Sequence, residues 1–125
     1  MPTRLTFDDT RARLLAAMPA LAGGEFAPAD EVGLRHAPAW IGEFGAVRDA
    51  ASLWLWLDGA AVTRGSEPAM GQTVLDVPEG RYLVESYDVE TRSWVSRESA
   101  QSPPLVIGIP RRAGPVVLRV TRTAA

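Results

Sequence analysis

Apolar and polar positions alternate in short runs over residues 72–97, a pattern typical of β-strands. The first run ends at residues 78–80, Pro-Glu-Gly, which favour a tight turn because proline presets φ and glycine tolerates φ above zero. A second run covers residues 82–89, the polar residues 88–92 predict the next turn, and Trp94 begins a third run. The pattern predicts a meander of three consecutive strands joined by hairpins.

Five further segments have the length and apolar content of strands, and glycine, proline or aspartate bounds them. They cover residues 33–37, 44–48, 52–58, 105–109 and 115–122. Loops are expected between them at residues 60–71 and 99–104. The segment 52–58, SLWLWLD, is the most apolar run, so we expect it to be buried on both faces at the centre of its sheet. Strands without intervening helices favour an antiparallel β-sandwich of about seven or eight strands over a βαβ sheet.

One short helix is predicted near the N-terminus, over about residues 7–18. Thr6 and Asp9 have the spacing of a capping box, and Pro19 interrupts the hydrogen-bond ladder of a helix. The apolar side chains recur at helical spacing: Phe7, Leu14, Leu15 and Met18. A helix this short depends on packing its apolar side against another element. We therefore expect one mainly β domain over residues 1–125, with the helix packed on a sandwich of about residues 33–122.

The composition excludes some classes of function. All thirteen basic residues are arginine, and lysine and asparagine are absent, as codon bias in a GC-rich genome would produce. A net charge of −2 provides no field that attracts nucleic acid or an anionic membrane, so we expect neither partner. There is no long apolar stretch and no secretory signal, which predicts a cytoplasmic chain as written, or a secreted one if it is a fragment.

No pattern in the sequence predicts catalysis, a metal or a cofactor. The absence of cysteine excludes thiolate chemistry and disulfides. His36 is the only histidine, and no serine stands in a nucleophile-elbow motif. Asp30 and Glu31 lack the spacing of calcium ligands, and the glycines form no phosphate-binding loop. We therefore expect a protein that is not an enzyme.

Four stretches together resemble a known kind of module. They are residues 77–82, VPEGRY, residues 86–91, SYDVET, residues 105–107, LVI, before Pro110, and residues 116–120, VVLRV. Over roughly residues 50–122 they are similar to the small, immunoglobulin-like β-sandwich accessory modules at the C-terminal end of many glycoside hydrolases. The hairpin motif of those modules is G-x-Y followed by D-P-x-T-G. The resemblance implies a non-catalytic accessory role, associated with carbohydrate.

Two positions depart from that motif. Val89 stands where the modules have proline, and Arg92 stands where they have glycine. The second departure has a physical consequence, because glycine adopts positive φ freely whereas arginine adopts it only at an energetic cost.

Trp54 and Trp56 lie two residues apart, so their side chains share one face of the predicted strand while leucines line the other. They could form an exposed platform on which sugar rings stack. Alternatively, the N-terminal helix covers them, which would give that helix its hydrophobic partner and avoid a large exposed apolar patch.

The predicted turn at residues 88–92 provides the other candidate ligand-binding residues. Tyr87 and Trp94 flank the turn, as a cross-strand aromatic pair or as part of a binding edge. Asp88, Glu90 and Arg92 would supply hydrogen bonds at its tip. Two hypotheses stay open: a carbohydrate-binding accessory module, and a domain that docks on another protein chain with no small ligand.

Overall fold

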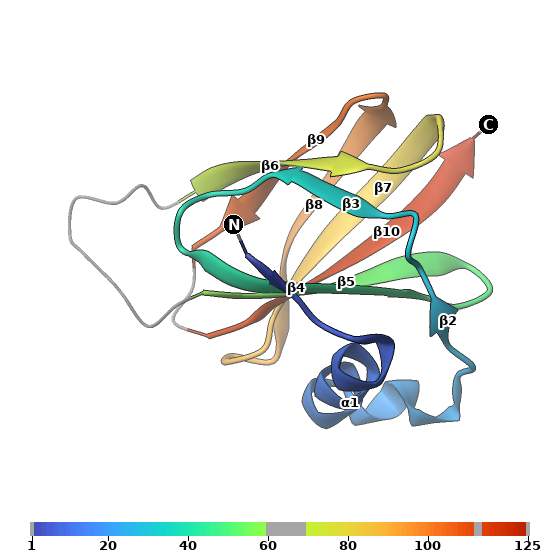
Figure 1. Cartoon of the computed structure of the whole chain (residues 1–125), viewed down its shortest axis with the longest axis vertical. Helices are drawn as coiled ribbons and strands as arrows, with labels where there is room; N and C mark the ends of the chain where they lie inside the picture. The colour runs from blue at the N-terminus through green and yellow to red at the C-terminus, as the bar shows by residue number, and fades with distance from the viewer. Residues whose placement is uncertain (1, 60–69, 112–113, 125) are drawn as a thin grey trace.

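The computed structural model describes residues 2–59, 70–111 and 114–124 (Figure 1). Within them the chain is mainly β, with one α-helix, α1 (Phe7–Ala17), followed by a short 3-10 helix at Pro19–Gly23. The described strands are β1 (Thr3–Arg4), β2 (Ala27–Pro28), β3 (Gly33–His36), β4 (Ile41–Arg48), β5 (Ser52–Gly59), β6 (Met70–Asp76), β7 (Gly80–Asp88), β8 (Ser93–Ser102), β9 (Leu105–Pro110) and β10 (Val116–Ala124). About seven or eight strands were expected from the sequence; β1 and β2 are only two residues long.

The strands form two sheets, neither of which closes into a barrel. The larger has seven strands in the order β1-β4-β5-β10-β7-β8, with β2 paired to β4, and the smaller has the order β3-β6-β9. Among the described strand pairs, only β1 and β4 run parallel, so the smaller sheet is antiparallel as expected, whereas the larger sheet is mixed. A parallel pair needs a long connection, and α1 lies within that connection.

One hydrophobic cluster is shared by the facing sides of the two sheets. Leu55 and Leu118 enter it from the larger sheet, and Leu75 and Ile107 enter it from the smaller one; each is at most 1% exposed. Burying such a side chain contributes roughly 1.5–3 kcal/mol. Figure 1 shows the smaller sheet on one side of the larger sheet and α1 on the other.

The segment at residues 78–80 does not form the predicted hairpin. β6 belongs to the smaller sheet and β7 to the larger, so this turn carries the chain from one sheet to the other. The Tyr82 hydroxyl donates a hydrogen bond to the Pro78 carbonyl oxygen at 2.7 Å, which ties the crossing to the start of β7. Local turn chemistry predicts where a strand ends, whereas the choice of partner strand depends on contacts distant in sequence.

The predicted loop at residues 99–104 was also wrong over most of its length. β8 continues to Ser102 and pairs with β7 throughout, for example Ser99 with Leu83 and Gln101 with Arg81. Its polar residues are compatible with a strand because β8 is the outermost strand of the larger sheet and is mostly exposed. The loop predicted at 60–71 lies outside the described residues except at its end, where Met70 and Gly71 belong to β6.

α1 begins as the sequence predicts. The Thr6 hydroxyl oxygen accepts a hydrogen bond from the backbone amide of Asp9 at 3.1 Å, which satisfies one of the free amides at the helix start. The helix packs against β4 and β5, on the side of the larger sheet opposite the shared core.

The β7–β8 hairpin was predicted correctly, and its turn holds a strained residue. Arg92 has a φ of 56°, in the left-handed region, at the position where the resembling modules have glycine. We expect Arg92→Gly to raise the free energy of unfolding by about 0.5–1 kcal/mol, because the relief of strain exceeds the entropic cost of glycine. Urea denaturation would measure it. Arg97→Gly, within β8, is the matched control and should destabilise; a similar loss for both variants would contradict the prediction.

Candidate functional site

Trp54 and Trp56 lie beneath α1. β5 is central, between β4 and β10, and its two indoles project away from the shared core, as predicted. They are only 4% and 6% exposed, in a second hydrophobic cluster with Leu14 of α1 and the partly buried Phe7 and Met18. The structure therefore corrects the assignment of Trp54 and Trp56 as ligand-binding residues: the helix covers the surface on which a sugar would stack.

Both buried indoles have carboxylate partners. Trp54 Nε1 donates to Asp49 Oδ2 at 2.9 Å, and Trp56 Nε1 donates to Glu43 Oε1 at 3.2 Å. Burial raises the pKa of Asp49, but hydrogen bonds from Trp54 and two backbone amides, together with the charge of Arg119, outweigh this and leave the pKa below its usual value. Burial and the nearby charge of Glu43 raise the pKa of Asp58. The hydrogen bonds of both indoles are thus made within the fold.

The remaining aromatic pair is on the part of the larger sheet formed by β10, β7 and β8. Tyr87 and Trp94 are directly opposite each other across the hairpin, with ring centroids 5.2 Å apart and an interplanar angle of 65°, so the predicted cross-strand pair is confirmed. Trp94 is 42% exposed, whereas Tyr87 is half-buried. Trp94 is therefore an indole that a ligand can reach.

Arg119 of β10 joins the exposed indole to the buried one. Its guanidinium carbon lies 4.4 Å from the ring centroid of Trp94 and 5.6 Å from that of Trp54. Glu85 Oε1 accepts a hydrogen bond from Arg119 Nε at 2.9 Å and forms an ion pair with Arg119 Nη2 at 2.8 Å, which restrains the guanidinium. Stacking of a cation on an indole contributes roughly 0.5–2 kcal/mol.

These residues share one surface, which we call the open face. Strand alternation and register place its members on the side of β10, β7 and β8 away from the smaller sheet. They include Arg81, Glu85, Tyr87, Trp94, Arg97 and Arg119. Sequence patterns did not place Arg119 beside Trp94 or Glu85 beside Arg119, because these contacts follow from a β10–β7 register between segments far apart in the chain. Alternation within each strand indicated only which side each residue faces.

The three polar candidates of the turn differ in their availability. Asp88 is 2% exposed; its carboxylate accepts hydrogen bonds from the Glu90 amide at 3.1 Å and the Thr91 hydroxyl at 3.0 Å. It therefore shapes the turn and is not open to a ligand, contrary to its assignment. Glu90 and Arg92 are exposed at the tip, as predicted.

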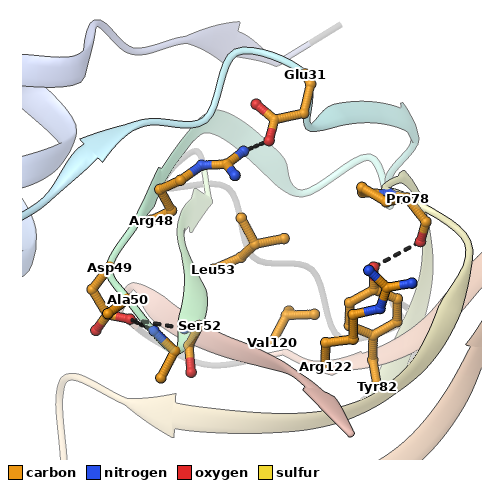
Figure 2. A pocket seen from close by; sticks show the side chains of 11 residues that line it. Glu31, Arg48, Asp49, Ala50, Ser52, Leu53, Pro78, Tyr82, Val120 and Arg122 are labelled. Carbon is orange, nitrogen blue, oxygen red and sulfur yellow. Dashed lines mark hydrogen bonds and ion pairs between the residues drawn. The ribbon is translucent and has the colours of Figure 1, made fainter. Parts of the chain in front are cut away.

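A cavity of about 210 Å³ opens near the β4–β5 turn, at one end of the two sheets (Figure 2). Leu53, Val120 and Tyr82 provide apolar lining. An ion pair between Arg48 and Glu31 crosses one side, and Figure 2 shows both side chains reaching toward each other over the opening. On the other side Arg122 donates to the Glu79 carbonyl oxygen at 2.6 Å. The charged groups at this cavity are already paired with protein atoms, so the open face is the stronger candidate.

His36 is the other single residue considered from the sequence, and Trp40 is the fourth tryptophan of the chain. His36 is exposed at the end of β3, and Trp40 is half-buried with the Arg111 guanidinium 5.7 Å from its ring centroid. Among the described residues, no group of three or more histidine, aspartate or glutamate side chains is placed to hold a metal ion. None of the helices in the described part of the chain has the length and apolar character needed to span a membrane.

Comparisons of the chain with protein families, with curated proteins and with solved structures found no match.

Proposed function

We propose that the chain is a non-catalytic β-sandwich accessory module that binds carbohydrate through its open face. The observation that carries the proposal is the exposed indole of Trp94, which contacts Tyr87 and Arg119, with Glu85 bound to Arg119. An indole offers a flat apolar surface for the apolar face of a sugar ring, and charged side chains beside it can hydrogen-bond the hydroxyls. The two sheets around a shared core support the sandwich fold, and the motif resemblance supports the accessory role.

A protein partner is the second candidate, and a separate observation favours it. Tryptophan, tyrosine and arginine are the residue types enriched at the energetic centres of protein interfaces, and all three meet at Trp94. Val106, on the outer strand β9 of the smaller sheet, is also 39% exposed. This alternative predicts binding that no glycan competes for.

We expect Trp94→Ala to weaken binding to a recognised polysaccharide by about 10-fold or more, because the stacking surface is lost. Tryptophan fluorescence with acrylamide quenching, repeated over a panel of soluble polysaccharides, would identify the ligand, and affinity electrophoresis would measure the loss. Val106→Ala, an exposed apolar truncation on the other sheet, is the control and should bind normally. A panel that leaves emission and quenching unchanged would reject the carbohydrate role and leave the protein partner.

A further inference from the structure

The open face is positively charged although the chain as a whole carries a net charge of −2. It holds three arginines, Arg81, Arg97 and Arg119, and one glutamate, Glu85. Asp49 accepts hydrogen bonds from the Trp54 indole and two backbone amides, and its charge acts on Arg119, so with Asp49 included the net charge is +1. The face therefore attracts anions in a protein that overall does not.

Register explains why the acidic residues do not cancel this charge. Glu85 is paired in register with Arg119 on one side and with Arg97 on the other, but its carboxylate binds Arg119. Glu98, the neighbour of Arg97 in sequence, faces the other side of β8 and accepts a hydrogen bond from the Gly108 amide at 2.8 Å. Adjacent residues of a strand project to opposite faces, so this carboxylate lies away from the open face.

Two of the three guanidiniums are available to a ligand. Arg81 and Arg97 are exposed, and within the described residues their side chains make no hydrogen bond or ion pair. Beside Arg81 is a hollow of about 380 Å³ whose lining includes the polar residues Ser99, Gln101 and Thr123. Such a hollow offers hydroxyl and amide groups to a sugar, next to a free cation.

We infer that the ligand of the open face is an anionic polysaccharide built from uronic acids; this rests on the proposed carbohydrate-binding function. Guanidinium groups bind carboxylates through two parallel hydrogen bonds, and Trp94 would stack a ring that carries such a carboxylate. Arg97 and the Gln101 position opposite Arg81 are four residues apart on β8, roughly 14 Å along the strand. Because that span exceeds one sugar ring, a polymer with repeated carboxylates fits both arginines better than a monosaccharide does.

The test compares polygalacturonate and alginate with two neutral polymers, hydroxyethylcellulose and galactomannan, on the intact chain. We expect the polyuronates to bind at least about 10-fold more tightly, and their binding to weaken as salt rises to about 0.2 M. Arg81→Gln and Arg97→Gln should each weaken polyuronate binding by about 3- to 10-fold. Arg11→Gln, an equal charge change at an exposed position of α1, is the matched control and should bind normally.

The failures of the two proposals are distinguishable. Neutral polymers bound as tightly as polyuronates, with Arg81→Gln and Arg97→Gln unchanged, would overturn the uronate inference and leave carbohydrate binding in place. Polyglutamate bound as tightly as polyuronate would overturn it in favour of an acidic protein partner. No binding to any polymer, by the parent chain or by the variants, would reject both proposals.

Discussion

Gly45→Ala is expected to lower the free energy of unfolding by about 2–3 kcal/mol, because α1 packs against β4 where glycine leaves no side chain. A Cβ atom at this position would lie 2.1 Å from Thr10 Oγ1 and 2.8 Å from Thr10 Cγ2. Thr10 is fully buried, and its hydroxyl donates to the Thr6 carbonyl oxygen at 2.8 Å, so it cannot move aside without losing that bond. The helix would have to lift from the sheet.

Urea denaturation of the parent chain and of Gly45→Ala would measure the change. Gly23→Ala is the matched control: nothing lies within 4 Å of a Cβ at Gly23, so its free energy of unfolding should change by less than about 0.5 kcal/mol. Lifting of α1 should also red-shift tryptophan emission, because the helix covers Trp54 and Trp56. Equal stabilities for the two variants would show that α1 is not closely packed on β4.

Sequence patterns predicted the local features of this fold well. Alternation and apolar runs placed the main strands, including the central β5 with leucines on one side and tryptophans on the other. Thr6 and Pro19 marked the two ends of α1, and the length of the turn paired Tyr87 with Trp94. Each of these depends on residues that are near one another in sequence, where capping, turn and alternation rules apply directly.

Features set by distant contacts were not predictable in the same way. The turn at residues 78–80 looked like a hairpin, yet it crosses between sheets, because β6 finds its partners in β3 and β9. The polar sequence of β8 suggested an early end, whereas pairing with β7 extends it to Ser102.

In the candidate site, too, the local features were predictable from the sequence and the contacts between distant segments were not. The sequence identified Trp94 and Tyr87, but Arg119 and Glu85 join them only through strand register. It left open whether Trp54 and Trp56 meet a ligand or the helix, since an apolar pattern is the same for either partner. Asp88 seemed available because it adjoins a polar turn, and its burial follows from the side of β7 that it faces. Whether these side chains are available to a ligand is decided by the packing of elements that are distant in sequence.

Trp54→Ala is expected to lower the free energy of unfolding by about 3–5 kcal/mol, whereas Trp94→Ala should lower it by less than about 1.5 kcal/mol. Both indoles contact the guanidinium of Arg119, so the two truncations remove the same residue type from opposite sides of one cation. Trp54 is 4% exposed and its loss would leave a cavity under α1, as well as an Asp49 carboxylate without its indole donor. Trp94 is 42% exposed and leaves no such void.

Urea denaturation, paired with affinity electrophoresis on the same samples, separates the roles of the two tryptophans. If the open face binds ligand, Trp94→Ala should lose binding while it keeps most of its stability. The main effect of Trp54→Ala should be the loss of stability. A stability loss at Trp94 as large as that at Trp54 would mean that the exposed indole is a structural residue. The proposed function requires the first result, because Tyr87 and Arg119 contact the exposed indole and would hold it ready for a ligand.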